Sequence, residues 1–221
     1  MDSEVAIDIN GLSLRHDGQW VLRDFGLQLG VGEKVALTGP SGCGKSTVLR
    51  CILGLVIPDS GSISIMGTSV DSHSIWKARH SLAYVAQEPD LGRGTVIETI
   101  EKPFSYRANS HLRDNLKRLD KLMNRFNLPD TILRKQMSSL SGGEKQRIAL
   151  VTAILLDRPI VLLDEASSAL DKGNKQAVAD YFQQTEGITV LSVAHDVEWL
   201  GFSDRVVEMR KPGSSEEAKW I

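Results

Sequence analysis

One glycine-rich segment constrains the fold of this chain more than any other feature. It runs Gly39-Pro-Ser-Gly-Cys-Gly-Lys-Ser-Thr47 and matches the pattern G-x-x-x-x-G-K-[ST]. A short apolar stretch at residues 35–37 precedes it, and a helical pattern over residues 47–55 follows it. Strand, glycine-rich loop and helix in this order open a parallel α/β unit. The segment therefore predicts an α/β fold with a phosphate-binding loop.

Each residue type in this loop has a physical task. Glycines let backbone N–H groups turn toward a phosphate, and the following helix directs its positive end at the same anion. Lys45 adds a mobile charge for the β- and γ-phosphates, and the Ser46 hydroxyl can bind Mg²⁺. Cys43 is either a reactive thiol or a small filler, and we favour the filler. The predicted nucleotide contacts in the loop are Gly39, Ser41, Gly42, Cys43, Gly44, Lys45, Ser46 and Thr47.

A pair of acids follows a wholly apolar stretch in the C-terminal half. Residues 160–163 read as a strand buried on both faces, and Asp164 and Glu165 come directly after it. Ligands of open parallel sheets bind at the carboxyl ends of strands. Asp164 is therefore placed to hold Mg²⁺, and Glu165 to polarise a water for attack on the γ-phosphate. A carboxylate at this position predicts hydrolysis rather than binding alone.

The periodicity of apolar residues indicates how the chain is organised. Val5, Ile7 and Ile9 alternate with their neighbours, as do residues 25–29, which predicts antiparallel strands. Residues 112–126 carry apolar side chains at spacings of 4, 3, 4 and 3, which predicts one amphipathic helix. We expect a single domain over 1–221, with antiparallel β structure in 1–34 and 62–70, an α/β core in 35–61, 71–90 and 158–211, a helical subdomain in about 91–157, and a loose tail in 212–221.

The segment Leu140-Ser-Gly-Gly-Glu-Lys-Gln-Arg147 carries the family resemblance. Ser141 and Glu144 form an S-x-x-E capping box, so a helix begins here, and two glycines expose backbone N–H groups at its start. The segment resembles the LSGGQ signature of ATP-binding-cassette (ABC) proteins. That resemblance implies a P-loop NTPase cassette with a parallel-sheet RecA-like core, an N-terminal antiparallel β subdomain and an α-helical subdomain.

Further landmarks of the ABC family occur in the expected order. Gln87 resembles the Q-loop glutamine, Asp171 closes a Ser-Ala-Leu-Asp stretch that resembles the D-loop, and His195 resembles the switch histidine. The resemblance implies that Gln87 contacts Mg²⁺ or the attacking water and that His195 contacts the γ-phosphate. It also implies a head-to-tail homodimer around two MgATP. In that dimer Asp171 works across the interface, and the signature residues Ser141, Gly142, Gly143 and Glu144 face the nucleotide held by Lys45 of the other copy.

The adenine contact departs from the family pattern. The aromatic residue that usually stacks on the base would fall near Arg15 or His16, and Trp20 is out of register. Stacking on His16 is one option, and another residue is the alternative.

Charge and hydropathy restrict the kinds of partner that the chain can have. The formal charge of −2, from 26 basic and 28 acidic residues, argues against a nucleic-acid binder. Two cysteines are too few for a disulfide framework and favour a reducing compartment. No apolar run approaches the ~20 residues that span a bilayer, so we expect a peripheral protein at the cytoplasmic face of the membrane, acting on separate integral permease subunits. Residues 101–136 hold nine basic and four acidic side chains, a face for a partner or a solvated surface.

The sequence therefore predicts the ATP-hydrolysing subunit of an ABC transporter. Residues 87–100 resemble exporter-type cassettes, and residues 126–133 weakly resemble the small iron-export (Fet-type) ATPases, so export, of iron or another metal, is the favoured direction. The alternative is a non-transport ABC ATPase that acts as a mechanical or interaction module, either soluble or of the cell-division type. A small-molecule kinase that uses the same loop is a third and more distant possibility.

Overall fold

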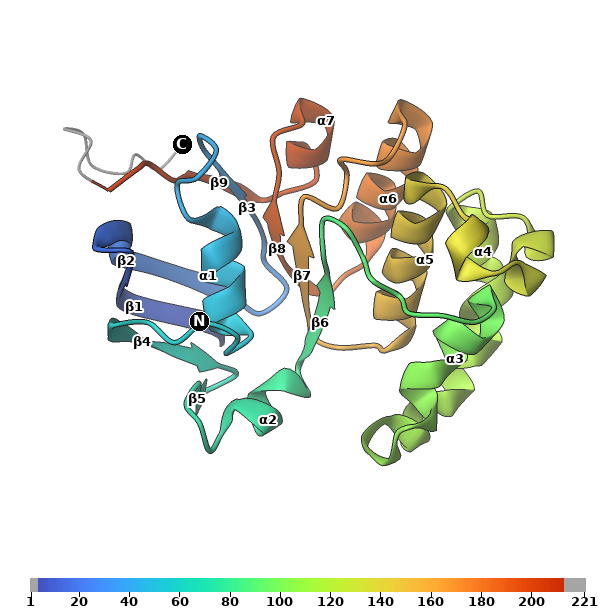
Figure 1. The fold of residues 1–221 in the computed structure, drawn as a ribbon, viewed down its shortest axis with the longest axis horizontal. Coiled ribbons are helices and arrows are strands. Elements are labelled where there is room, and N and C mark those ends of the chain that lie inside the picture. The colour runs from blue at the N-terminus through green and yellow to red at the C-terminus, as the bar shows by residue number, and fades with distance from the viewer. Residues whose placement is uncertain (1–3, 213–221) are drawn as a thin grey trace.

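The computed structural model describes residues 4–212, which form two β-sheets and a group of helices (Figure 1). Apart from Pro212, the predicted loose tail lies outside the described residues. Helix α1 (Lys45–Ile52) lies between the two sheets, and the larger helices α5 (Gly142–Leu155) and α6 (Lys172–Gln184) lie on the far side of the parallel sheet (Figure 1).

The N-terminal sheet is antiparallel. It contains β1 (Val5–His16), β2 (Gln19–Gly30), β4 (Ser60–Ile65) and β5 (Thr68–Ser69) in the order β2-β1-β4-β5. Asp17 and Gly18 join β1 to β2 with φ angles of 49° and 76°. Two consecutive residues with positive φ are what a tight hairpin turn between twisted strands requires. The predicted antiparallel strands are therefore present, and the hairpin is closed by the Asp-Gly pair.

The second sheet is wholly parallel, and the residues predicted to carry the chemistry lie at its strand ends. Its strands are β3 (Lys34–Thr38), β6 (Leu82–Val85), β7 (Ile160–Asp164), β8 (Thr189–Val193) and β9 (Arg205–Glu208), in the order β6-β7-β8-β3-β9. Short helices α2 (Ile75–Arg79) and α7 (Val197–Leu200) precede β6 and β9. Because all five strands run the same way, the loops after β3, β6, β7 and β8 open at one edge of the sheet.

The middle of the chain is helical. It comprises α3 (Val96–Ser105), the 3₁₀ helix η1 (Arg107–Arg118), α4 (Leu119–Arg125), the 3₁₀ turns η2 (Asp130–Arg134) and η3 (Met137–Ser139), and α5. Helix α3 begins at a capping box in which the Thr95 hydroxyl accepts a hydrogen bond from the Glu98 N–H.

One predicted helix is wrong in its extent. Residues 112–126 were expected to form a single amphipathic helix, but η1 covers the first half and α4 the second. The side chains of Asn109 and Asn115 donate hydrogen bonds to the carbonyls of Pro103 and Leu155, which lie in α3 and α5. Polar side chains that bond backbone elsewhere compete with regular helix formation. The apolar spacing correctly marked the inward face, since Leu119, Met123 and Phe126 are buried.

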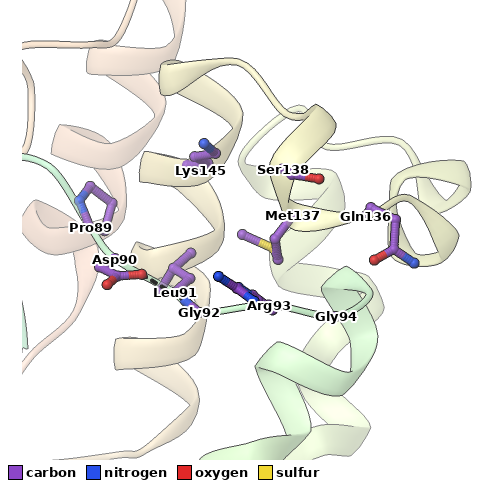
Figure 2. Close-up of a pocket in the computed structure, with 10 residues that line it drawn as sticks. All are labelled: Pro89, Asp90, Leu91, Gly92, Arg93, Gly94, Gln136, Met137, Ser138 and Lys145. Carbon is purple, nitrogen blue, oxygen red and sulfur yellow. Dashed lines mark hydrogen bonds between the residues drawn. The ribbon is translucent and has the colours of Figure 1, made fainter.

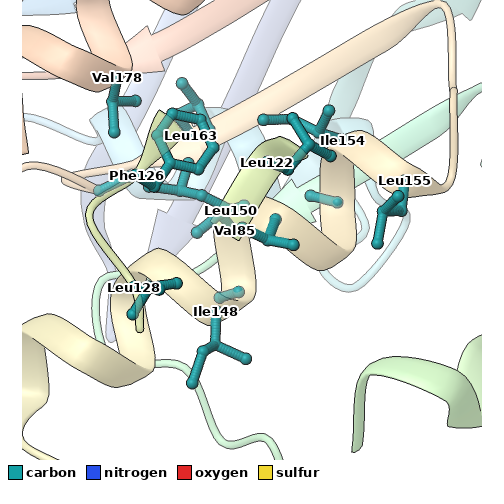
Figure 3. Packing of buried hydrophobic residues seen from close by; sticks show 14 of the residues in the cluster. Val85, Leu122, Phe126, Leu128, Ile148, Leu150, Ile154, Leu155, Leu163 and Val178 are labelled. Carbon is teal, nitrogen blue, oxygen red and sulfur yellow. The ribbon is translucent and has the colours of Figure 1, made fainter. Parts of the chain in front are cut away.

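Strand β7 separates two hydrophobic cores. Val161 and Leu163 pack with α5 and α6 in one core, whereas Ile160 and Leu162 pack with α1 and the antiparallel sheet in the other. Figure 3 shows Phe126, Leu163 and Val178 among the side chains of the first core. The ring of Phe126 meets that of Tyr181 edge-on, with centroids 5.6 Å apart. Phe126 therefore packs in the core that joins the helical layer to the parallel sheet.

Replacing Phe126 tests how much its packing stabilises the fold. We expect Phe126→Ala to lower the free energy of unfolding by about 3–5 kcal/mol, because it leaves a cavity in a closely packed core. Urea denaturation followed by circular dichroism measures the change. Tyr106→Ala is the matched control, since its side chain is 54% exposed and its loss should cost about 0.5 kcal/mol or less. Equal losses in the two variants would contradict the proposed packing role.

Candidate active site

The phosphate-binding loop, Gly39–Thr47, connects β3 to α1. Lys45 is buried, and its ammonium donates hydrogen bonds to the carbonyls of Gly39 at 2.8 Å and Pro40 at 3.1 Å. Cys43 is buried inside the loop, with its Sγ 3.9 Å from the Lys45 Nζ, as suits a filler. Gly44 has a φ of 99°, and a Cβ there would lie 2.7–2.8 Å from Leu22 and the Val21 carbonyl. Close packing on β2 therefore requires glycine at position 44.

Asp164 ends β7 and receives two hydroxyl groups. The Ser46 Oγ donates to Asp164 Oδ1 at 2.7 Å, and the Tyr84 hydroxyl, from β6, donates to Oδ2 at 3.2 Å. Burial raises the pKa of Tyr84 to about 12, and the neighbouring Asp164 carboxylate adds to the rise. Ser46 and Asp164, predicted separately from two motifs, are thus in direct contact.

The oxygen donors of Ser46 and Asp164 fit a magnesium ion. Mg²⁺ prefers oxygen ligands and is usually bound by one or two protein groups together with substrate phosphates and water. Within residues 4–212 there is no cluster of three or more His, Cys, Asp or Glu side chains that could hold a metal. The Ser46 hydroxyl and the Asp164 carboxylate beside a phosphate-binding loop match the usual Mg²⁺ site, in which one or two protein groups act together with substrate phosphates and water.

Two side chains from neighbouring strand ends lie close to the Glu165 carboxylate. Gln87, just after β6, donates its Nε2–H to Glu165 Oε2 at 2.9 Å. His195, just after β8, places its Nε2 3.7 Å from Glu165 Oε1. Glu165 itself has a φ of 47°, and its N–H donates to the Val193 carbonyl. Residues far apart in sequence therefore meet at one carboxylate, where they can orient a water and a phosphate oxygen.

Several supporting residues carry no motif that would have revealed them. Tyr84 is one, and its only sequence signal is a hydroxyl on a strand next to β7. Asp196 accepts hydrogen bonds from Lys175 at 3.0 Å and from Ser167 at 2.8 Å, and these bonds, the one from Lys175 first, hold its pKa below the usual range. Gln146 is wholly buried and donates to the Ala86 carbonyl, next to Gln87. These contacts fix the loops that present Gln87 and His195.

The signature turn, defined here as Ser141–Glu144, begins α5 with the predicted capping box. The Glu144 N–H donates to Ser141 Oγ at 3.2 Å, and the Ser141 N–H donates to Glu144 Oε2 at 2.8 Å. The second of these bonds is the main reason that the pKa of Glu144 lies below its usual range. Ser141 and Gly142 are exposed at the positive end of a fourteen-residue helix. The turn can therefore receive an anion from outside the chain.

The signature turn and the phosphate-binding loop lie on opposite faces of the parallel sheet. Helix α1 packs on the face formed by Ile160 and Leu162, and α5 packs on the face formed by Val161 and Leu163. Figure 1 shows β7 and β8 between the two helices. The structure thus groups the predicted residues into two sets that do not meet within one chain.

Asp171 and His16 belong to neither the phosphate-binding loop nor the signature turn itself. Asp171 is the N-cap of α6, where its Oδ1 accepts the Asn174 N–H at 2.9 Å, and this bond is the main cause of its lowered pKa. His16 ends β1, its side chain is exposed, and its Nε2 lies 3.6 Å from Asp17 Oδ2. The ring of Trp20 is covered instead by the Arg15 guanidinium, 3.9 Å from the ring centroid. The same hairpin packs on Gly44 of the phosphate-binding loop through Val21 and Leu22.

Comparison with known proteins identifies the class. Residues 22–168 match the sequence profile of the ABC transporter family, so the chain belongs to that family. It is an ABC transporter ATP-binding cassette and an ATPase, as the motifs predicted.

Individual relatives extend over nearly the whole chain. The chain is 36% identical over 204 residues to "Probable iron export ATP-binding protein FetA" of Escherichia coli K12, covering 90% of this chain and 89% of FetA. It is 30% identical over 222 residues to "Energy-coupling factor transporter ATP-binding protein EcfA1" of Oceanobacillus iheyensis, covering 98% and 79%. Both relatives are named as ATP-binding proteins of transport systems.

Solved structures confirm the predicted α/β cassette fold. The dimeric cassette MJ0796, described as a post-hydrolysis state bound to ADP and Pi, superposes with a TM-score of 0.79 at 26% identity, covering 97% of this chain and 98% of that one. A bacterial Atm1-family ABC exporter with ATP bound gives the same TM-score at 26% identity, with 93% of this chain and 37% of that chain covered. The chain therefore binds ATP, and its fold occurs in both dimeric cassettes and exporters.

The Tyr84–Asp164 contact predicts a loss of stability at alkaline pH. Tyr84 has an ordinary pKa of 10.0 when unfolded and about 12 when folded, so the folded chain keeps a proton that the unfolded chain gives up. This contribution is complete below pH ~10 and is lost as the pH rises toward 12. We expect the unfolding free energy of the wild type to fall more steeply above pH ~10 than that of Tyr84→Phe.

Urea unfolding at several pH values measures this difference. Tyr106→Phe serves as the control because Tyr106 is exposed, and it should follow the wild type. Parallel curves for the wild type and Tyr84→Phe would show that Tyr84 titrates at its ordinary pKa in the folded state.

Proposed function

We propose that this chain hydrolyses MgATP as a head-to-tail homodimer and thereby drives a separate membrane permease. The observation that carries the proposal is the placement of the signature turn and the phosphate-binding loop on opposite faces of one sheet. The N-terminal end of α5 can attract an anion but cannot reach the nucleotide of its own chain. It can bind a nucleotide if a second copy of the chain presents one there. The dimeric cassettes among the structural relatives support this arrangement.

Within one chain, each residue near the loop has a proposed task. Lys45 neutralises the β- and γ-phosphates, and Ser46 and Asp164 would hold Mg²⁺, which supplies further charge neutralisation at the phosphate oxygens. Glu165 accepts the proton of the attacking water as a general base. Gln87 and His195, which both face Glu165, orient that water and contact the γ-phosphate.

Across the dimer, Ser141 and Gly143 of one copy contact the γ-phosphate bound by the other, and Asp171 lines the same interface. His16 or another residue of the β1–β2 hairpin receives the adenine. The hairpin is suited to this because Gly44 packs directly on Val21 and Leu22. Hydrolysis then opens the dimer, and this motion is passed to the permease.

The permease is proposed to dock at a groove beside the Q-loop glutamine. Figure 2 shows this groove between the segment Pro89–Gly94, which follows Gln87, and the residues that precede and follow the signature turn. Arg93 and Lys145 line it together with Asp90. Among residues 4–212, no helix has the length and apolar character to cross a membrane. We place the chain at the cytoplasmic face, bound to permease subunits.

The proposed direction is export, with iron or another metal ion as the cargo. FetA, which is named as a probable iron export ATP-binding protein, supports this over 90% of the chain. The same fold serves an Atm1-family exporter.

Glu165→Gln tests the catalytic assignment. We expect it to reduce the turnover number for ATP about 100-fold or more, because the amide cannot accept a proton from water. Nucleotide affinity should change little, since Lys45 and the loop remain. With ATP bound and not hydrolysed, the variant should form dimers that multi-angle light scattering detects. Glu186→Gln, at an exposed carboxylate, is the matched control.

Two outcomes would contradict the proposal. Undiminished turnover in Glu165→Gln would remove Glu165 as the base. A variant that stays monomeric with saturating ATP at high protein concentration would contradict the shared-nucleotide dimer.

Charge reversal in the groove tests the partner. We expect tagged wild-type chain to copurify from detergent-solubilised membranes with a multi-helix membrane protein, and Arg93→Glu to lose that protein while it keeps basal ATPase activity. Lys121→Glu, an exposed cation outside the groove, is the control. Recovery of a wholly soluble chain without a membrane partner would favour the non-transport class of ABC ATPase.

A further inference from the structure

The signature turn lies directly against the D-loop, Ser168–Asp171, of its own chain. A Cβ built on Gly143 would lie 2.8 Å from the Ala169 carbonyl oxygen, a separation that real Cβ atoms do not show. A Cβ built on Gly142 would lie 3.9 Å from the Cβ of the same alanine. Glycine is therefore required at position 143 by the fold of one chain, whatever it contacts in a second one.

The carboxamide of Asn174 joins the same two segments from the side. Its Nδ2 donates to Asp171 Oδ2 at 2.7 Å, and its Oδ1 accepts from Arg147 Nη1 at 3.2 Å and from Asn127 Nδ2 at 3.0 Å. Both ends of this side chain are therefore used, one toward the D-loop and the other toward α5.

Arg147 extends the contact to the signature turn. Its Nε donates to the Gly143 carbonyl at 3.2 Å, and its Nη1 donates to the carbonyls of Phe126 at 3.0 Å and Asn127 at 2.8 Å. A planar guanidinium with five donors suits such a junction. The path from the signature turn to the D-loop thus runs through two side chains, Arg147 and Asn174.

We infer that Asn174 is a positioning residue that makes the signature turn and the D-loop of one chain move as a single unit. The inference rests on the proposed function, in which both segments face the nucleotide held by the partner copy. If the two are rigidly joined, their contacts with that nucleotide form and break together. Nucleotide binding and the interface contact of Asp171 then become one step.

The chemistry of the junction requires an amide. Asp171 needs a donor and Arg147 needs an acceptor, and an amide supplies both on one short side chain. A carboxylate at position 174 would keep the bond to Arg147 but would face the carboxylate of Asp171 with a like charge.

The repulsion between Asp171 and an aspartate at position 174 distinguishes a positioning role of Asn174 from a role in stabilising α6 alone. Position 174 is the third residue of that helix, where an acidic side chain favours helix formation. The N-cap bond, from the backbone N–H of residue 174 to Asp171 Oδ1, remains available in any non-proline variant. A purely structural role therefore predicts that Asn174→Asp is harmless.

Steady-state kinetics provides the first test, with Asn174→Asp and Asn174→Ala compared to the wild type. We expect the turnover number to fall about tenfold in both variants, because a charge-assisted hydrogen bond is lost where the closed dimer forms. The affinity of the monomer for a fluorescent ATP analogue and the melting temperature should stay close to the wild-type values. Gln176→Ala is the control, since Gln176 is exposed on the same helix and bonds to Asp180.

Hydrogen exchange on the monomer provides a second test that does not depend on dimerisation. In the wild type, the amides of residues 141–147 and 168–172 should exchange with similar protection. In Asn174→Ala, residues 168–172 should lose protection while residues 141–147 keep theirs.

The results distinguish this inference from the proposed function. Turnover within twofold of the wild type in both variants, or unchanged exchange in the D-loop, would overturn the role of Asn174. A fall in turnover number accompanied by a clearly lower melting temperature would also overturn the positioning role of Asn174, in favour of a structural role. Failure of the Glu165→Gln variant to dimerise would count against the proposed function, while the exchange measurement would still decide whether Asn174 joins the two segments.

Discussion

The complete burial of β7 is the constraint on which the rest of the structure depends. Every residue from Ile160 to Asp164 is buried, and alternate side chains enter two different cores. A strand packed on both faces has little freedom to shift in register or depth. Its carboxyl end therefore delivers Asp164 and Glu165 to a defined position at the edge of the sheet. The same strand holds α1 and α5 apart, and with them the phosphate-binding loop and the signature turn.

Neighbouring strand ends then complete the site around these two acids. Asp164 receives hydroxyl groups from Ser46 and Tyr84, and Glu165 receives an amide from Gln87 and lies near the imidazole of His195. Two adjacent carboxylates would repel each other, and each has its own set of partners. In the proposed function, Asp164 is part of an oxygen-rich site suited to Mg²⁺, and Glu165 lies beside groups that orient water.

Local patterns were read correctly where the physical cause is local. The loop Gly39–Thr47, the capping box at Ser141 and the apolar strand before Asp164 depend on residues a few positions apart, and all three are present. The amphipathic spacing of residues 112–126 marked the buried face but missed the break between η1 and α4. Within η1, Asn109 and Asn115 donate hydrogen bonds to carbonyls of other helices, and such long-range partners cannot be read from spacing.

The sequence by itself determined the class of chemistry: a phosphate-binding loop, a carboxylate after a buried strand and a second helix start with exposed backbone N–H groups. Each is specified by short-range backbone geometry and side-chain type. Only the tertiary structure decided how these parts face one another. The two faces of β7 send the signature turn away from the loop, and Gly143 meets Ala169 while Asn174 meets Arg147. Those relations join residues about 26 to 27 positions apart through space, and they depend on how helices pack on a sheet, which no local pattern encodes.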